Sequence, residues 1–333
     1  MADIVVGGFY GDEGKGKVVG YLAVKDEYDV VIRAGGGPQA GHTVTKDVKV
    51  TQAPSGLVNE AARLLIGRGT VLSPSKVLEE IKKYNLQERI GIDKGCTVIE
   101  PQHVEAEKEL VARIGSVGTG VGPARVDRVL RKAKLAKDVP ELKDYLVDVA
   151  REAGNAERSG KKVLIEGVQG FGLSLLDHEF YPYVTSQDTT ASQFAADAGI
   201  GPKHVKDVVV VYKSYVSRVG QGEMKSQWTE AQQKELGIEE RGTVSGRARR
   251  LGDFDKDLAL ESMARNTGTM AAITCVDRLF KGNDSITDRE RLSPKAKAFI
   301  EDVNVFLQKS TSHYKGVKLV STGPNLEDMV DLR

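Results

Sequence analysis

The segment from Gly11 to Val18 carries the residues best suited to hold phosphate. It reads Gly-Asp-Glu-Gly-Lys-Gly-Lys-Val and closely follows the apolar run Ile4–Val6, so it lies between an expected strand and an expected helix. The spacing matches the phosphate-loop pattern, in which glycine N–H groups, a helix N-terminus and a lysine surround phosphates. Val18 replaces the Ser or Thr that normally holds Mg²⁺, so a metal needs another ligand, and Asp12 is the nearest carboxylate. We expect nucleotide phosphates here; a solvated glycine-lysine turn is the alternative interpretation.

Two further loops carry candidates for phosphate or carboxylate chemistry. His42 follows the glycine-rich turn Ala34–Gly41, which itself follows the apolar run Val30–Ile32. A lone histidine is more often structural, but its place after such a turn favours a general acid or a phosphate contact. The segment Arg247–Arg250 holds three arginines directly after Gly242–Gly246. Arginine forks bind carboxylates and phosphates bidentately, so this loop could hold a small anion.

Two features have weaker interpretations. Asp277 ends the apolar run that starts at Ile273, and a carboxylate there could accept from guanine N1 and N2, although such an aspartate is usually a helix cap. A glycine-rich loop over 115–122 precedes a segment that we expect to be a basic helix, mostly a solvated face. Its cations are Arg125, Arg128, Arg131, Lys132, Lys134 and Lys137.

The elements that must position these loops alternate along the chain. Short, β-branched apolar runs predict strands buried on both faces. They are Ile4–Val6, Val30–Ile32, Leu64–Ile66, Val163–Ile165, Val208–Tyr212, Ala271–Thr274 and Val317–Val320. Helical patterns cover Pro74–Tyr84, Val104–Ile114, Val139–Ala153, Glu230–Leu236, Asp255–Asn266 and Pro294–Lys309. This order predicts an α/β fold: a mainly parallel central sheet flanked by helices, with a phosphate-loop-like first βα turn. We expect a single domain with insertions over residues 1–333.

Composition and charge narrow the class of protein. The chain of 333 residues has 48 Lys and Arg against 47 Asp and Glu, a net charge of +1, which argues against a dedicated nucleic-acid binder. No apolar run approaches the roughly 20 residues of a membrane span, and no signal peptide is apparent. Cys96 and Cys275 stand alone, so neither a disulfide framework nor a zinc ribbon is indicated. We expect a cytoplasmic protein that binds neither nucleic acid nor a membrane.

Several segments together, and in this order, resemble the adenylosuccinate synthetase family. The loop Gly11–Lys17 matches that family's signature almost letter for letter, and the resemblance covers essentially the whole chain. The short length and Phe171–Leu175 are most similar to the archaeal-type branch. The other matching segments are Ala40–Thr43, Glu166–Gly170, Tyr181–Ser186, Gly246–Arg249 and Ser321–Pro324.

The resemblance implies a GTP- and Mg²⁺-dependent ligase. It would join L-aspartate to C6 of a 6-oxopurine nucleoside monophosphate through a 6-phosphoryl intermediate. Asp12 would take the N1 proton of the purine and touch Mg²⁺, and Gly41 would offer its carbonyl to the metal. His42 would donate to the phosphates of GTP and Lys15 would stabilise the transferring group. Gln169 completes the implied catalytic set.

The resemblance also implies which residues bind each substrate. For GTP they are Gly11, Glu13, Gly14, Lys15, Gly16, Lys17, Gly41, Thr43, Arg249, Asp277, Ser321 and Gly323, the last three reading the guanine. For the purine monophosphate they are Asp12, Gln39, Ser116, Val117, Arg131, Gln169, Thr185, Val219 and Arg247. For aspartate they are Val244, Ser245, Arg247 and Arg249. Arg131 would come from the partner subunit of a homodimer.

The sequence departs from the family mainly around the purine acceptor. Gln39 stands in place of Asn, Val117 in place of Thr, and Asp253 where an aromatic residue is common; Cys275 replaces a Lys before Asp277. Two acceptors therefore stay open: IMP, giving adenylosuccinate for AMP, or dGMP, giving 2-amino-2'-deoxyadenylosuccinate for diaminopurine DNA. A phage branch of the family uses dGMP, although its members often lack the carboxylate at the position of Asp12 and use ATP. A phosphate-loop GTPase switch without ligase activity is the alternative function.

Overall fold

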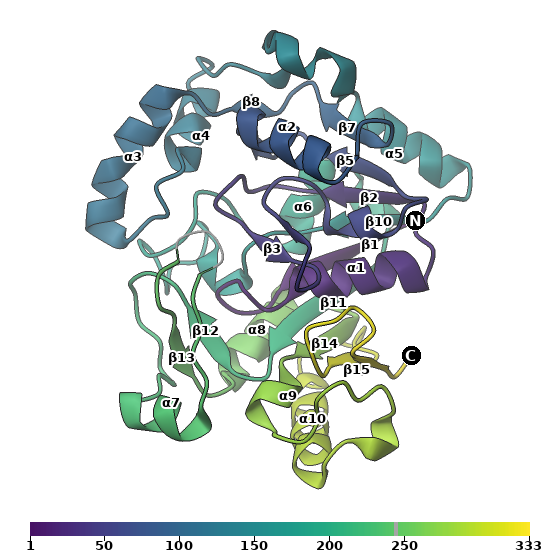
Figure 1. Cartoon of the computed structure of the whole chain (residues 1–333), viewed down its shortest axis with the longest axis vertical. Coiled ribbons are helices and arrows are strands. Elements are labelled where there is room, and N and C mark those ends of the chain that lie inside the picture. Colours follow the sequence, from purple (N-terminus) through teal and green to yellow (C-terminus); the bar gives the residue numbers. More distant parts are fainter. Residues whose placement is uncertain (243–245) are drawn as a thin grey trace.

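A ten-stranded sheet runs through the computed structural model, which describes residues 1–242 and 246–333 (Figure 1). The strand order is β16-β15-β14-β11-β1-β10-β2-β5-β7-β9. All neighbouring strands pair in parallel except β15 and β16, which pair antiparallel. The strands are β1 (Ala2–Gly7), β2 (Val30–Arg33), β5 (Arg63–Ile66), β7 (Ile90–Asp93), β9 (Leu146–Val147), β10 (Val163–Glu166), β11 (Val205–Lys213), β14 (Met270–Thr274), β15 (Val317–Ser321) and β16 (Met329–Asp331). The predicted α/β fold with a mainly parallel sheet is confirmed.

Helices cover both faces of this sheet, and three two-stranded ribbons lie outside it (Figure 1). The helices are α1 (Lys15–Lys25), α2 (Pro74–Lys83), α3 (Pro101–Ile114), α4 (Val121–Val129), α5 (Val149–Arg158), α6 (Ala191–Ala198), α7 (Glu230–Leu236), α8 (Lys256–Arg265), α9 (Val276–Leu279) and α10 (Pro294–Leu307). The ribbons pair β3 (His42–Thr43) with β4 (Lys49–Val50), β6 (Val71–Leu72) with β8 (Thr97–Val98), and β12 (Val216–Arg218) with β13 (Arg250–Gly252). Short 3₁₀ helices occupy Ser55–Val58, Ala136–Asp138, Pro140–Tyr145, Phe171–Leu173, Pro202–His204 and Arg289–Arg291.

The alternation of side chains along the strands builds one hydrophobic core on each face of the sheet. In β1, Val5 packs into the core that contains Val18 and Leu22 of α1. Its neighbours Ile4 and Val6 lie in the opposite core, with Phe194 of α6 and Met263 of α8 among others. Successive side chains of a strand point to opposite faces, so an unbroken apolar run is what a doubly covered sheet requires. All seven predicted strands are present for this reason.

Two of the predicted helices differ from the structure by more than three residues. The helix predicted over Val139–Ala153 is wrong, because a 3₁₀ helix begins at Pro140, β9 follows, and Asp148 then caps α5 by accepting from the Arg151 N–H at 3.0 Å. The predicted basic helix is present as α4, but it ends at Val129 and so is shorter than predicted. Arg131 has a left-handed backbone, with φ of 60°, which a continuing helix does not allow. The cations beyond it therefore do not share a helical face.

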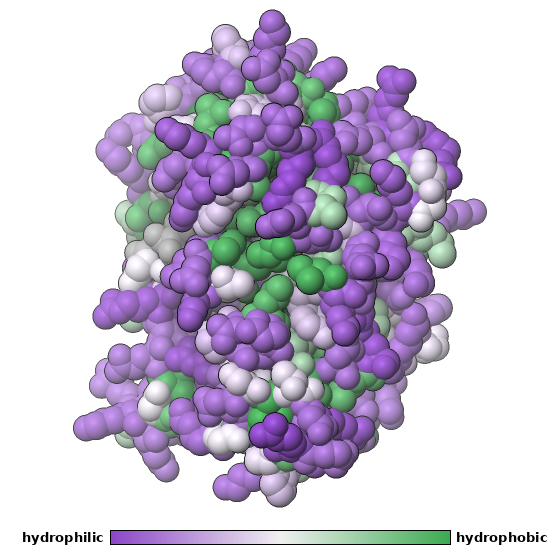
Figure 2. Space-filling model, turned by 45° about the vertical axis from the view of Figure 1, so that its right-hand side comes forward, coloured by the Kyte–Doolittle hydropathy of each residue, from purple (hydrophilic) through white to green (hydrophobic). Residues whose placement is uncertain are grey.

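Hydrophilic side chains cover most of the face in Figure 2, and hydrophobic ones gather in its middle. Among residues 1–242 and 246–333, no helix is long and apolar enough to cross a membrane.

Candidate active site

The loops that could do chemistry follow parallel strands of the sheet and so meet at the carboxyl ends of these strands. The carboxyl ends of such strands form the crevice where α/β folds bind ligands. The phosphate loop follows β1, the segment with Gln39 and His42 follows β2, and Gln169 follows β10. Asp277 and Ser321 stand at the same ends of β14 and β15. The sheet order therefore explains why residues distant in sequence share one site.

The phosphate loop is shaped from within by Glu13. Its buried carboxylate accepts from the backbone N–H of Phe9 at 3.0 Å and of Gly11 at 2.8 Å, and it pairs with Lys15 Nζ at 2.6 Å. Thr274 Oγ1 donates to the Glu13 carbonyl at 2.6 Å and ties the loop to β14. The sequence-based role of Glu13 was contact with GTP; in the structure its carboxylate holds the loop and its lysine in place.

The predicted catalytic residues line one cavity. Asp12, Lys15, His42 and Gln169 all border a cavity of 140 Å³, together with Gly41. A second cavity, of 290 Å³, adjoins it and shares six of its residues: Gln39, Gly115, Val117, Gln169, Leu173 and Val219. Ser116 and Thr185 border only the second cavity. The small cavity with the predicted catalytic residues thus adjoins a larger one bordered by most of the residues expected to hold the purine monophosphate.

Asp12 is tied to a chain of buried charges. Its Oδ1 lies 2.8 Å from Arg249 Nη2, and Arg249 Nη1 lies 3.0 Å from Glu240 Oε2. Glu240 also pairs with Lys213 at 2.6 Å and with Arg278 at 2.8 Å. Burial raises the pKa of Asp12, and the cation of Arg249 opposes that rise. A carboxylate with a raised pKa is better suited to accept a proton than an ordinary aspartate.

His42 is a buried, neutral imidazole held by a carboxylate. Burial and the neighbouring Arg33 lower the pKa of His42 to about 4. Its Nδ1 contacts Glu166, which also accepts from Ser55 N–H at 2.6 Å and from Arg33 at 3.2 Å. Burial alone would raise the pKa of Glu166, but these partners hold it at about 2. Glu166 stays ionised and holds the proton on Nδ1, which leaves Nε2 of the neutral ring as an acceptor.

Two amide side chains present unpaired acceptors at the cavities. Gln169 Nε2 donates to Thr185 Oγ1 at 2.5 Å, while Gln169 Oε1 and Gln39 Oε1 are buried and have no partner in the described part of the chain. Gln169 also has a left-handed backbone, with φ of 63°. Buried acceptors without partners are costly, and strained residues gather at functional sites. Both observations favour a ligand with N–H donors at this place.

Lys17 belongs to the phosphate-loop motif, but its amine lies against a different loop. Nζ donates to Ser321 Oγ at 2.8 Å and to the carbonyls of Gly323 and Asp328 at 2.7 and 2.8 Å. Burial lowers its pKa to about 8, although nearby carboxylates including Asp277 oppose this. The residues expected to read guanine therefore gather around Lys17, next to the first turn of α1.

The remaining predicted residues lie farther from the cavities or outside the described part of the chain. Arg131 is exposed at the end of α4, lines neither cavity, and its Nη1 donates to the Val129 carbonyl at 2.6 Å. Thr43 is exposed. Arg247 lines neither cavity, but it donates to the carbonyls of Gly115 and Ser116 at 3.0 and 2.7 Å, and these two residues border the second cavity. Val244 and Ser245, predicted to bind aspartate, lie outside the described residues.

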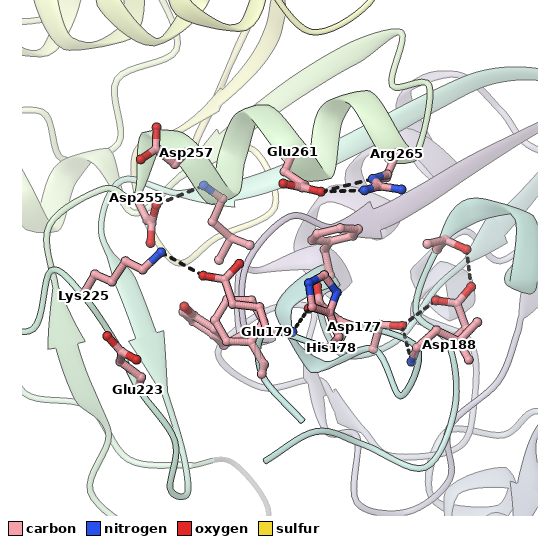
Figure 3. Close-up of a pocket in the computed structure, with 17 residues that line it drawn as sticks. Asp177, His178, Glu179, Asp188, Glu223, Lys225, Asp255, Asp257, Glu261 and Arg265 are labelled. Carbon is pink, nitrogen blue, oxygen red and sulfur yellow. Dashed lines mark hydrogen bonds and ion pairs between the residues drawn. The ribbon is translucent and has the colours of Figure 1, made fainter. Parts of the chain in front are cut away.

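A third cavity, of 540 Å³, lies on the other side of Tyr10, which borders it and the smallest cavity alike. Figure 3 shows acidic side chains around it, several of them already partnered. Glu179 pairs with Lys225 at 2.8 Å and Glu261 with Arg265 at 3.0 Å. None of the predicted catalytic residues borders this space, so we place the candidate site in the two smaller cavities.

Sequence reasoning missed the charged residues that support the site. Glu166 lies within a segment that resembles the family, but no role was assigned to it; its signal is a carboxylate at the end of the apolar run Val163–Ile165. Arg33 has a corresponding signal, because it is a charged residue at the end of the apolar strand β2. Glu240 carries no local signal, because its partners Lys213, Arg249 and Arg278 come together only in the fold.

The site's oxygen ligands fit a magnesium ion that is held mainly by substrate phosphates. Asp12 and Gly41 border the same cavity. In residues 1–242 and 246–333, no cluster of three or more His, Cys, Asp or Glu could hold a metal. Mg²⁺ bound to nucleotides needs only one or two protein oxygens, with phosphates and water completing the octahedron. A lone carboxylate beside a backbone carbonyl is therefore a sufficient donor set.

Adenylosuccinate synthetases resemble this chain along its whole length. The adenylosuccinate synthetase family profile matches residues 4–141 and 133–287. Adenylosuccinate synthetases are 48% identical in Archaeoglobus fulgidus, 47% in Thermococcus onnurineus and 46% in Methanococcus maripaludis. These alignments cover at least 99% of this chain and 98% of each relative.

Two solved structures share the fold. A fully ligated adenylosuccinate synthetase from Plasmodium falciparum superposes with a TM-score of 0.90 at 22% identity, covering 100% of both chains. The succinoaminodeoxyadenylate synthetase of cyanophage S-2L, bound to dGMP and dATP, superposes with a TM-score of 0.81 at 24% identity, covering 99% of this chain and 95% of that one. The full-length matches at 46–48% identity decide the family. The chain belongs to the adenylosuccinate synthetase family and is a GTP-dependent carbon–nitrogen ligase.

Proposed function

We propose that this ligase joins L-aspartate to IMP and so forms adenylosuccinate, with GDP and phosphate as the other products. The observation that carries the proposal is the single cavity bordered by Asp12, Lys15, His42 and Gln169. The choice of IMP is supported by the name of the relatives at 46–48% identity and by the presence of Asp12. dGMP is the second acceptor to test, because Gln39 and Val117 depart from the family on that side of the site.

In the first step the purine loses its N1 proton to Asp12, and O6 attacks the γ-phosphate of GTP. The raised pKa of Asp12 suits it to accept this proton. Gln169 stands across the same cavity, where its amide can bind the 6-oxo edge of the base. Lys15 is positioned to offset the charge that spreads over the transferring group. GDP leaves, and the purine carries the phosphoryl group on O6.

In the second step the amine of aspartate attacks C6 and expels phosphate. Arg247 and Arg249 are proposed to bind the two carboxylates of aspartate, because they come from one segment and contact Ser116 and Asp12, which border the cavities. Glu240 would keep the charge of Arg249 balanced when its fork turns from Asp12 to the substrate. Two arginines acting together fix the amine's direction of attack, which is the main contribution of such clamps.

Asp12 and the Gly41 carbonyl are proposed to hold Mg²⁺ together with the phosphates of GTP. When bound, the ion would neutralise charge on the β- and γ-phosphates. His42 is proposed to donate from Nε2 to a phosphate oxygen. It is neutral in the free chain, so the negative charge of GTP has to favour its protonation by offsetting Arg33.

A homodimer is proposed to complete the site. Arg131 is exposed beside an apolar surface on α3 and α4, formed by Val104, Val111, Val126, Val129 and Leu130. Several exposed apolar side chains on two packed helices favour an interface with another chain. A second copy of the chain packed on this surface could bring its Arg131 to the phosphate of the purine nucleotide.

The test is phosphate release with GTP, Mg²⁺ and L-aspartate, with IMP in one reaction and dGMP in the other. Turnover that needs both aspartate and IMP is the expected result. Turnover with dGMP and not with IMP would identify dGMP as the acceptor of the same two-step reaction. Phosphate release that needs neither aspartate nor a purine nucleotide would indicate a GTPase switch instead.

A further inference from the structure

Lys17 has no hydrogen left for a phosphate. An ammonium group offers three donors, and Lys17 Nζ has three acceptors at 2.7–2.8 Å: Ser321 Oγ, the Gly323 carbonyl and the Asp328 carbonyl. The side chain is 7% exposed, and it borders neither of the two cavities that form the candidate site. Lys15, two residues earlier, does border the reaction cavity. The two lysines of the motif therefore face different parts of the nucleotide site.

The contact with Lys17 sets the direction of the Ser321 hydroxyl. An ammonium can only donate, so Ser321 Oγ must accept from it, and the serine's own hydrogen must point elsewhere. Within the chain its next acceptor is the Gly323 carbonyl at 3.4 Å, which is long for an O–H donor. A ligand oxygen could take this hydrogen in a shorter bond. The positive charge 2.8 Å from Ser321 also favours a ligand atom with negative partial charge.

The same contacts fasten the loop after β15 to the phosphate loop. Lys17 lies in the first turn of α1, directly after the phosphate loop, and two of its acceptors are backbone carbonyls of the segment 323–328. Asn325 N–H donates to the Asp328 carboxylate at 2.8 Å and closes this segment on itself. Lys17 thereby ties the phosphate loop directly to the loop that carries Ser321 and Gly323.

We infer that Lys17 is a positioning residue for the guanine of GTP. It holds the Ser321 hydroxyl as a donor toward the 6-oxo group of the base, and it fixes the position of the loop after β15 relative to the phosphate loop. Guanine has an acceptor at that atom and adenine has a donor, so the arrangement distinguishes the two bases. Asp277, in α9 directly after the neighbouring strand β14, would supply the acceptor that guanine N1–H and the 2-amino group need. The inference rests on the proposed contact of Asp277 and Ser321 with the base.

Equilibrium binding separates a base-positioning role from a phosphate-binding role. We would measure GDP and inorganic tripolyphosphate binding to the wild-type chain, Lys17→Met and Lys15→Met, without IMP or aspartate. Lys17→Met should weaken GDP binding by about tenfold or more and leave tripolyphosphate binding within twofold, because one hydrogen-bond donor to the base is lost. Lys15→Met, the matched control, should weaken both ligands. Lys17→Arg should recover part of the GDP affinity.

A double-mutant cycle with Ser321→Ala tests the coupling. If Lys17 acts through Ser321, the double variant should bind GDP hardly less tightly than Lys17→Met alone. Equal weakening of GDP and tripolyphosphate by Lys17→Met would overturn the inference, as would fully additive effects. If Lys17→Met does not fold, as judged by its circular dichroism, Ser321→Ala alone must lower the affinity for GDP and not for ADP. Since no acceptor purine is present, the result does not depend on whether the chain uses IMP.

Discussion

Arg249 Nη2 lies 2.8 Å from Oδ1 of Asp12, so the proposed base is paired with a cation in the free chain. That cation opposes the rise in pKa that burial causes. Removing it with Arg249→Leu should move the acidic limb of the kcat/KM profile to higher pH, by about one unit at saturating aspartate. Arg247→Leu, which changes an arginine of the same segment whose guanidinium donates to the carbonyls of Gly115 and Ser116, is the matched control. If the acidic limb moved equally in both variants, the pKa that sets this limb would not be that of Asp12.

Asp12→Ala should abolish phosphate release in the complete reaction while GTP binding stays within an order of magnitude. The reason is that Glu13 and the loop backbone, and not Asp12, shape the phosphate loop. Steady-state turnover and equilibrium GTP binding are the two measurements. Asp257→Ala, an exposed carboxylate of the third cavity, is the control and should keep wild-type turnover. Turnover by Asp12→Ala above a few per cent of wild type would refute its role as the base.

GTP binding should draw a proton onto His42. Burial and Arg33 keep its pKa near 4, so the ring is neutral at pH 6.5, and a triphosphate beside Nε2 should raise that pKa. Calorimetric titrations at pH 6.5, in two buffers with different ionisation enthalpies, should show net proton uptake. His42→Asn should remove most of this uptake. Identical uptake in both chains would mean that His42 stays neutral in the complex.

Mixed dimers should regain activity if Arg131 completes the partner's site. Arg131→Leu and Asp12→Ala should each be inactive alone. When unfolded and refolded together, half of the dimers combine one subunit of each kind, and each such dimer holds one intact site. Phosphate release should therefore return to about a quarter of the wild-type rate. If mixed dimers are isolated through a purification tag carried by only one variant and still show no recovery, Arg131 does not contribute to the partner's site.

The sequence predicted the fold well where local pattern and burial agree. The seven apolar runs became strands because each is buried on both faces, as the opposite placement of Val5 and Ile4 illustrates. It failed over Val139–Ala153, where Pro140 and the capping Asp148 divide an apparently continuous helical period. The helix α6 was not predicted, because four of its eight residues are alanine and Phe194 is its one large apolar residue, so its apolar stripe is weak.

For the site, the residue types indicated the chemistry but not the partners. Asp12 and His42 were found from their loops and Gln169 from the family resemblance, and all three border one cavity. The direction of Lys17 could not be predicted, because it depends on the end of β15 lying beside α1. The same holds for Glu240, whose charge is balanced by residues from three distant segments. Ion pairs between residues that lie apart in the sequence form only once the fold brings those residues together.

The two ends of the central sheet have a consequence for how copies of the chain can meet. One edge is β9, with two residues, and the other is β16, with three, where Asp331 pairs with Arg333 at 2.6 Å. Such short or charged edges offer few free N–H and C=O groups to a strand from another molecule. Ribbon-like growth by edge-to-edge addition is thereby disfavoured at high concentration. Copies of the chain must therefore associate through side-chain surfaces. Such a surface can be complementary to one partner, so that the assembly closes and does not grow further.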